Sequence, residues 1–235
     1  MKLGRQSVKK KRRSGRLARV LGWSALVLLV AHLLCAIALA GLRFVNPPTT
    51  GVQIQRRVGS LIIRGKYEKR QTFVPLSRIA PDLQHAVIAA EDGRFYEHGG
   101  IDWKQVRIVA EDSLESGEVP RGASTIPQQL VKNLFFTTHR NPLRKAAEYT
   151  LAPMADVILG KQRTLELYLN VAEWGPGIFG AEAAAYFHYG VSASRLSREQ
   201  AARLAAILPA PVRRKPGRMN GYSSSIQTRM RQMGW

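Results

Sequence analysis

The chain has one cysteine and few acidic residues. Cys35 is the sole thiol among 235 residues, so a framework of intrachain disulfides is excluded. The 16 Asp and Glu residues are outnumbered by 36 Lys and Arg, which gives a formal net charge of +20. A strongly positive chain favours anionic partners, which are either nucleic acid or the phosphates of a membrane surface. Internal repeats are also lacking, which excludes a repeat architecture.

The positive charge is concentrated at the two ends of the chain. Residues 1–19 contain nine Lys and Arg and no acid, and residues 203–235 contain seven and no acid. About +4 remains for everything between them. The centre is therefore an ordinary mixed-charge domain, and the length leaves room for one domain of moderate size plus an appendage.

A long apolar run follows the basic N-terminus. With His32 neutral, residues 20–42 carry no charge, and a helix of that length spans about 35 Å, more than the roughly 30 Å hydrocarbon core of a bilayer. A cleaved signal peptide is the alternative, although its apolar region is usually only about 7–15 residues long. Because basic residues precede the run and Arg43 alone follows it closely, a cytoplasmic N-terminus is predicted, with the rest of the chain outside the plasma membrane.

The remaining sequence predicts a mainly α-helical domain. Segment 43–69 is interpreted as a linker or extended arm, with one or two short strands as an alternative between residues 52 and 74. A helix is expected from Pro81, and segment 117–123, which contains Gly117, Pro120 and Gly122, is expected to be a loop. Further helices are expected near 102–116, 125–136, 142–159, 162–170, 179–187 and 197–208. The predicted divisions are a basic tail (1–19), a membrane helix (20–42), the arm (43–69), a main domain (70–215) and a basic C-terminal segment (216–235).

Two adjacent carboxylates, Glu91 and Asp92, stand at the end of an Ala-rich helical pattern. The helix dipole disfavours acids at a helix C-terminus, so the pair calls for a reason other than helix stability. A solvated helix end is the plain alternative. A carboxylate in this position can also act as a general base.

A run of hydrogen-bond donors comes next. Thr125 and Gln128 have the spacing of a capping box, which accounts for a helix start but not for the polar residues that follow. Amide and ammonium groups at a helix N-terminus are suited to phosphate. The predicted phosphate-binding run comprises Ser124, Thr125, Gln128, Gln129, Lys132 and Asn133.

Cations and a second carboxylate follow the donors. Arg140 comes first, and Arg144, Lys145 and Glu148 then lie within about one helical turn and can converge on one spot. A solvated basic face is the alternative for these residues. The order of acid, donors, cations and second acid favours a site that binds a phosphorylated sugar donor on a lipid and uses one Glu as a base.

In this order the motifs resemble those of the family 51 glycosyltransferases, the peptidoglycan glycan-chain polymerases. The chain is most similar to their monofunctional members, which lack a penicillin-binding domain. The likeness runs from about residue 70 to residue 212. The matching residues are Glu91, Asp92, Phe95, His98 and Gly100, then Gly122, Ser124, Thr125, Ile126, Gln128, Gln129, Lys132 and Asn133, then Arg144, Lys145 and Glu148, and finally Leu165, Glu166, Tyr168, Leu169 and Asn170.

A few positions depart from the family pattern. Pro127 stands where Ser or Thr is usual, and Thr164 replaces the usual Ile. The final family motif begins with an Arg, and Ser225 stands where that Arg is expected. None of these departures removes an acid or a predicted phosphate-binding cation.

The resemblance implies a lysozyme-like glycosyltransferase domain over residues 70–215 that polymerises lipid II, a disaccharide-peptide on undecaprenyl pyrophosphate. Glu91 and Glu148 are the implied catalytic residues. Glu91 would deprotonate the sugar 4-hydroxyl that attacks C1 of the growing chain, which forms a β1,4 bond and releases undecaprenyl pyrophosphate. Glu148 would either orient the neighbouring cations or hold a magnesium or manganese ion against the phosphates, although no dedicated cluster of metal ligands is visible. The implied substrate-binding residues are Asp92, Ser124, Thr125, Gln128, Gln129, Lys132, Asn133, Arg140, Arg144 and Lys145.

Two other functions remain as alternatives. A membrane-anchored lysozyme-like lytic enzyme needs an acid to protonate a leaving sugar oxygen rather than a pyrophosphate-binding site. A noncatalytic basic tether would bind anionic polymers through charge alone. The expected partners are lipid II, the growing glycan chain, the membrane, and cell-wall synthesis or division proteins, and nucleic acid is not expected. The expected location is the bacterial inner membrane, crossed once, with a cytoplasmic N-terminus and a periplasmic domain.

Overall fold

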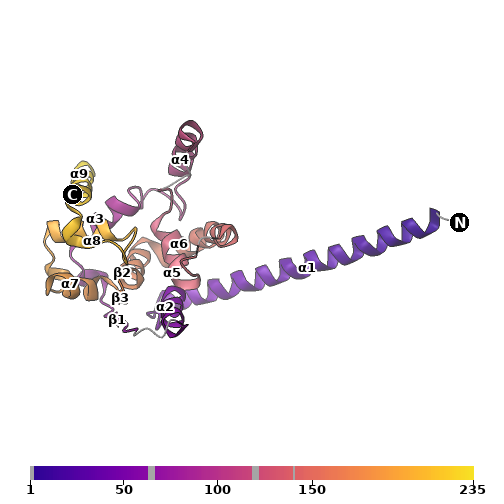
Figure 1. Cartoon of the computed structure of the whole chain (residues 1–235), viewed down its shortest axis with the longest axis horizontal. Coiled ribbons are helices and arrows are strands. Elements are labelled where there is room, and N and C mark those ends of the chain that lie inside the picture. The colour runs from indigo at the N-terminus through magenta and orange to yellow at the C-terminus, as the bar shows by residue number, and fades with distance from the viewer. Residues whose placement is uncertain (1–2, 63–66, 118–121, 140) are drawn as a thin grey trace.

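A computed structural model describes residues 3–62, 67–117, 122–139 and 141–235, with side chains described from residue 19 onward. Helix α1 (Leu3–Leu42) projects from a helical domain as one long rod (Figure 1). Within it, the stretch Arg19–Leu42 contains an 18-residue window with a mean hydropathy of 2.6 and is long and apolar enough to cross a membrane. A helix of membrane-spanning length is therefore present where the membrane helix was predicted, and the basic tail continues the same helix from Leu3.

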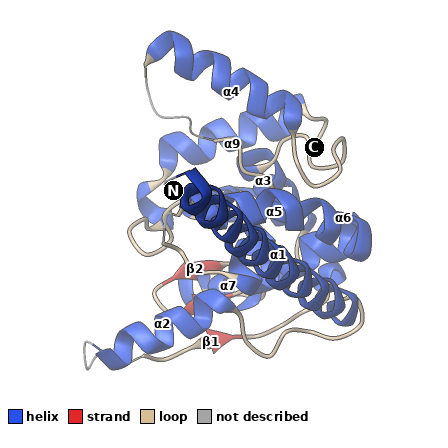
Figure 2. Ribbon diagram, turned by 90° about the vertical axis from the view of Figure 1, so that its right-hand side faces the viewer, coloured by secondary structure: helices blue, strands red, loops and turns tan. Residues whose placement is uncertain are grey.

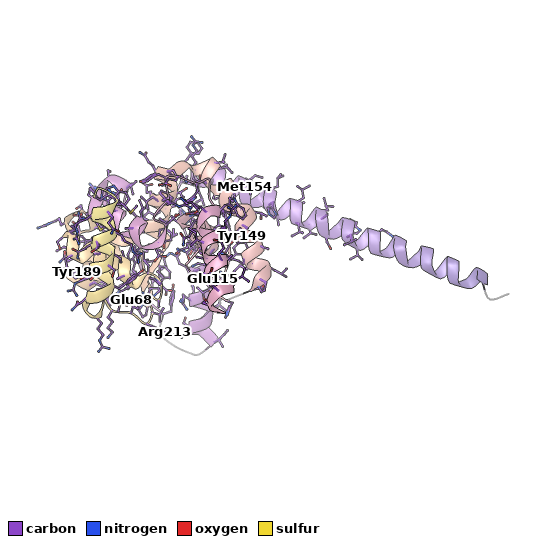
Figure 3. The ribbon with its side chains drawn as sticks, turned by 90° about the horizontal axis from the view of Figure 1, so that it is seen from above. Glu68, Glu115, Tyr149, Met154, Tyr189 and Arg213 are labelled. Atoms are coloured by element: carbon purple, nitrogen blue, oxygen red, sulfur yellow. The ribbon has the colours of Figure 1, made fainter. Side chains whose placement is uncertain are left out.

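The C-terminal part of α1 packs against the domain. Leu39 is fully buried, and His32 Nε2 lies 2.8 Å from Thr150 Oγ1 of helix α6 (Pro142–Val171). Figure 3 shows Met154, also on α6, where α1 meets the domain. Helix α1 thus contacts the same helix that carries the predicted cations Arg144 and Lys145.

The prediction of an extended arm over 43–69 is wrong for much of its length. Residues Gly51–Ile62 form helix α2, which Thr50 starts by accepting a hydrogen bond from the Gln53 backbone N–H at 3.3 Å. The two-residue strand β1 (Arg70–Gln71) follows. Val52 is buried, whereas Ile54, Val58, Leu61 and Ile62 are exposed. These four have the spacing of one helical face, so the sequence did contain a helical pattern, which the prediction of an extended arm overlooked.

The expected helices are present, with ends within about two residues of those predicted, the usual uncertainty of helix boundaries. The two helices expected at 142–159 and 162–170 are joined in α6 across a kink at Gly160, where φ is 73°. The remaining helices are α3 (Pro81–Glu91), α4 (Trp103–Ser116), α5 (Ile126–Phe135), α7 (Ala181–Tyr189), α8 (Arg198–Ile207) and α9 (Asn220–Gln232), with short 3₁₀ turns η1 (Leu76–Arg78), η2 (Ala193–Arg195) and η3 (Pro216–Arg218).

A small sheet lies beside the helices, in red in Figure 2. Strand β3 (Ile178–Phe179) is central, parallel to β1 and antiparallel to β2 (Glu173–Gly175). Strands this short give no alternating pattern in the sequence, so β2 and β3 were not predicted.

The C-terminal segment belongs to the domain core. Ile226 and Met230 of α9 are fully buried, and α9 packs on α3 and α8. The expected division after residue 215 therefore does not mark a break in the packing. Helix α3, which ends at Glu91, lies between α9 on one side and α5 on the other (Figures 1 and 2).

Candidate functional site

The Glu91 carboxylate lies where α3 ends against α5. Its Oε2 accepts a hydrogen bond of 2.7 Å from Gln129 Nε2, and its Oε1 is buried without a hydrogen-bond partner among the described residues. Burial raises the pKa of Glu91, while the Gln129 hydrogen bond and the charges of Lys132 and Arg214 act in the opposite direction. A carboxylate with an unpaired oxygen and a raised pKa is suited to proton transfer.

Both carboxylate oxygens of Asp92 form contacts within the protein. Its Oδ2 accepts from the backbone N–H of Ile126 at 2.9 Å, and its Oδ1 lies 2.8 Å from His98 Nε2. The Ile126 N–H is one of the free donors at the start of α5, so Asp92 fixes the end of α3 to the beginning of α5. Its predicted contact with substrate stays a prediction, since both oxygens here are bonded within the protein.

The start of α5 is fixed by a capping box. The Thr125 hydroxyl accepts from the Gln128 N–H, and the Gln128 side chain accepts from the Thr125 N–H. Thr125 Oγ1 also donates to the Gly100 carbonyl at 2.6 Å.

Gly100 has a φ of +90°, and a Cβ there would lie 2.7 Å from the Ala152 carbonyl carbon. Glycine is therefore required, and it lets this loop lie directly on α6.

Gln129 is oriented in turn by Tyr168. The Tyr168 hydroxyl donates to Gln129 Oε1 at 2.9 Å, which leaves the Gln129 amide N–H to face Glu91. Tyr168 is 1% exposed. It was noted as part of a motif but not predicted as a site residue. The 39-residue separation from Gln129 gives no local signal of their contact.

Glu148 organises two of the predicted cations. It is 4% exposed, and its Oε1 pairs with Arg144 Nη1 at 2.9 Å while its Oε2 pairs with Lys145 Nζ at 3.2 Å. Lys145 Nζ also donates to Ser124 Oγ at 3.0 Å. The helical spacing that predicted this convergence is confirmed, and Lys145 links the start of α6 to Ser124, which precedes the N-cap residue Thr125 of α5.

Lys132 completes the cation cluster, which we define as Lys132, Arg144 and Lys145. Its ammonium forms no hydrogen bond or ion pair with the described residues, yet the charges of Glu148 and Glu91 act on it. Burial lowers its pKa, and those two carboxylates partly offset that effect. Lys132 thus lies within the influence of both predicted catalytic acids with its donors available to a ligand.

The remaining predicted residues are less informative. Asn133 is 8% exposed on α5, and Arg140 lies outside the described residues. Across the described ranges, no group of three or more His, Cys, Asp or Glu side chains is placed to hold a metal ion.

A cavity of about 260 Å³ opens beside Glu91. The end of α3, the segment before α5 and the C-terminal helix contribute to its wall, including Glu91, Asp92, Ser124, Thr125 and Arg229. Arg229 and Arg214 come from the C-terminal part of the chain, where sequence reasoning found no site residue. The C-terminal segment contains many basic residues, so the sequence does not show which of them lie in the site.

The sequence model of the transglycosylase family matches residues 58–233. The chain belongs to the transglycosylase family. The match covers all the elements that build the site and includes α9, beyond the boundary expected from motifs alone.

Relatives support the same assignment. The chain is 50% identical over 180 residues to a biosynthetic peptidoglycan transglycosylase of Rhizobium meliloti (strain 1021), which covers 75% of this chain and 73% of the relative. A protein of the same name from Pseudomonas putida (strain W619) is 40% identical over 223 residues, covering 93% and 91%. Another, from Agrobacterium fabrum, is 43% identical over 212 residues, covering 88% and 89%.

The predicted family and the glycosyltransferase class are confirmed by these comparisons. The predicted fold class, a mainly α-helical lysozyme-like domain with a single N-terminal helix of membrane-spanning length, is confirmed as well. The roles of individual residues stay predictions that rest on the geometry of the site.

Proposed function

We propose that this transglycosylase joins the disaccharide units of lipid II into β1,4-linked glycan strands and releases undecaprenyl pyrophosphate. The observation that carries the proposal is the placement of Glu91 and the cation cluster. The Glu91 carboxylate at the end of α3 has a raised pKa, and its charge interacts with that of the Lys132 ammonium on α5. This pairing supplies a base for an attacking hydroxyl and positive charge for a departing phosphate.

Glu91 acts as the general base. Its Oε1 accepts the proton of the acceptor's 4-hydroxyl as that oxygen bonds to C1 of the growing chain. The bond from C1 to the phosphate oxygen breaks in the same displacement, and its electron pair leaves with the pyrophosphate. A positioned base contributes about 10²–10⁴-fold to such a step. Inversion at C1 of an α-linked donor gives the β product.

The cation cluster stabilises the leaving group. Negative charge grows on the pyrophosphate as the bond to C1 breaks, and fixed cations offset charge that develops in the transition state. Lys132 presents three donors to this charge. Arg144 and Lys145 are held in position by Glu148, so little reorganisation is needed when the substrate binds.

Glu148 fits the orienting role that the sequence left open. Both of its oxygens pair with cations, and this neutralised carboxylate is a poor match for a resident divalent ion, which takes oxygen ligands with uncompensated charge. A magnesium or manganese ion held by Glu148 stays a prediction from the sequence, and no step of the proposed reaction depends on it.

The membrane helix keeps the site beside its lipid-linked substrate. The positive-inside rule supports a cytoplasmic N-terminus and a single crossing of the bacterial inner membrane, with residues 44–235 in the periplasm. This location gives access to lipid II, to the growing glycan chain, and to the cell-wall synthesis or division proteins expected as partners.

A lytic enzyme is the nearest rival, because a raised carboxyl pKa also suits a general acid. A hydrolase or lyase, however, has no phosphate leaving group that would use the cation cluster. Purified full-length protein should therefore convert labelled lipid II into long strands that muramidase degrades. Release of fragments from preformed glycan, without strand formation, would contradict the proposal and favour the lytic alternative. Binding of glycan with neither strand formation nor cleavage would favour the noncatalytic basic tether.

A further inference from the structure

The C-terminal part of the chain places three side chains beside the end of α3. Arg229 of α9 lines the cavity next to Glu91, and its Nη1 donates to the Ala89 carbonyl at 3.3 Å. The Arg229 guanidinium carbon lies 5.9 Å from the centre of the Tyr222 ring. Arg214 approaches the same ring, with its guanidinium carbon 5.5 Å from the centre. Two guanidinium groups thus share one aromatic ring by cation–π attraction.

Each arginine is also attached to a different helix. Arg214 Nη1 donates to the Ala206 carbonyl of α8 at 2.8 Å, and its charge acts on the Glu91 carboxylate. Arg229 bonds one of the last carbonyls of α3, where a helix leaves its acceptors without internal partners and favours a cation. Arg229 lies one turn after Ser225, the position where the final family motif has an Arg.

We propose that Arg214, Tyr222 and Arg229 form a positioning cluster that supports the last turn of α3, and with it the Glu91 carboxylate, from the α9 side. The proposal rests on the proposed role of Glu91 as the base. Since α3 lies between α9 and α5 (Figures 1 and 2), the carboxylate is supported from both sides. On the α5 side Gln129 bonds it directly.

The ionisation of Glu91 then depends on the C-terminal segment. Burial has the largest effect on the pKa of Glu91 and raises it; Gln129, Lys132 and Arg214 lower it, and Asp92 raises it. Because the positive charge of Arg214 favours ionised Glu91, its removal should raise the Glu91 pKa. A smaller fraction of Glu91 is then ionised at a given pH, and the acidic limb of the activity profile moves to higher pH.

Direct titration of Glu91 tests the electrostatic part of the cluster. Full-length protein in detergent, labelled with ¹³C at the glutamate side-chain carboxyl groups, is titrated by NMR, and the Glu91 signal is identified by its loss in Glu91→Gln. The titration midpoint should rise in Arg214→Ala and stay unchanged in Arg213→Ala, which removes the neighbouring exposed arginine labelled in Figure 3. If the Glu91 titration midpoint is the same in Arg214→Ala and Arg213→Ala, or if it falls in Arg214→Ala, the electrostatic role of Arg214 is wrong. This readout needs no catalysis, so it decides the cluster even if the wild-type protein fails to polymerise lipid II.

Kinetics test the positional part. Arg229→Ala should lower kcat for lipid II polymerisation by about tenfold through displacement of Glu91, with a much smaller change in KM. Arg229→Lys, which keeps a donor for the Ala89 carbonyl, should restore part of the loss. Thermal unfolding of each variant shows whether the fold is retained. A wild-type kcat in a folded Arg229→Ala protein, or no difference between the Lys and Ala variants, would contradict the positioning role.

Discussion

Gln129 connects the Glu91 carboxylate to a buried tyrosine. Its Nε2 donates to Glu91 Oε2 at 2.7 Å, and its Oε1 accepts from the Tyr168 hydroxyl at 2.9 Å. Because Tyr168 is fixed in the core, the Gln129 amide has one preferred orientation, with its donor toward Glu91. One oxygen of Glu91 is thereby bonded, and the other is buried without a hydrogen-bond partner among the described residues.

Gln129→Ala should move the acidic limb of the activity profile to higher pH. The Gln129 hydrogen bond favours ionised Glu91 and lowers its pKa, so its loss raises that pKa further. The base is then protonated over a wider pH range, and the rate recovers only at higher pH. The pH dependence of kcat/KM for lipid II polymerisation measures this shift. Tyr168→Phe should move the limb in the same direction by less, and an unchanged limb in both variants would contradict the orienting role.

Lys132→Ala should reduce polymerisation by about 10²-fold or more, because it removes a partly buried cation that stabilises the leaving pyrophosphate. Arg195→Ala is the control, since Arg195 is an exposed cation at the end of η2, away from the site. A solvated surface charge contributes only about 0–1 kcal/mol. Equal and small effects of the two substitutions on the polymerisation rate would mean that Lys132 provides only general attraction to anions.

Gly100→Ala should destabilise the domain. The added Cβ would lie 2.7 Å from the Ala152 carbonyl carbon, and the φ of +90° is unfavourable for alanine. Strain of this kind costs about 1–3 kcal/mol before the clash is counted. Thermal unfolding should show a clear fall in Tm, whereas Gly99→Ala, where a Cβ would meet nothing within 4 Å, should change Tm little. Similar Tm values for the two variants would show that the close approach of this loop to α6 is dispensable.

A periplasmic reporter fused after Trp235 should be active, and a reporter that works only in the cytoplasm should be inactive there. The expectation follows from the nine basic residues of the first 19 and the apolar stretch Arg19–Leu42. Reversed reporter activities would refute the topology and the access to lipid II that depends on it.

Local motifs predicted much of this molecule. The acid pair at the end of a helix, the capping box of Thr125 and Gln128, and the turn that unites Arg144, Lys145 and Glu148 are all encoded within a few residues. Their positions in the fold follow from helix geometry and are confirmed by the structure.

Features that depend on distant contacts were missed. Tyr168 meets Gln129 through tertiary packing, and Arg229 reaches Ala89 across 140 positions of sequence. The sequence contains no periodic pattern that would predict either contact. Helix α2 is a different case, because Ile54, Val58, Leu61 and Ile62 do have helical spacing, and the local pattern was overlooked in favour of an extended arm.

The rate of lipid II polymerisation by Glu91→Gln tests the central claim most directly. Gln has nearly the shape of Glu but cannot accept the hydroxyl proton, so donor binding should remain close to wild type while the rate falls by at least about 10²-fold. Binding and rate are measured on the same purified, full-length variant, with strand formation followed after muramidase digestion. A variant that still polymerises at more than about a tenth of the wild-type rate would show that Glu91 is not the base, since loss of a general base costs at least about 10²-fold.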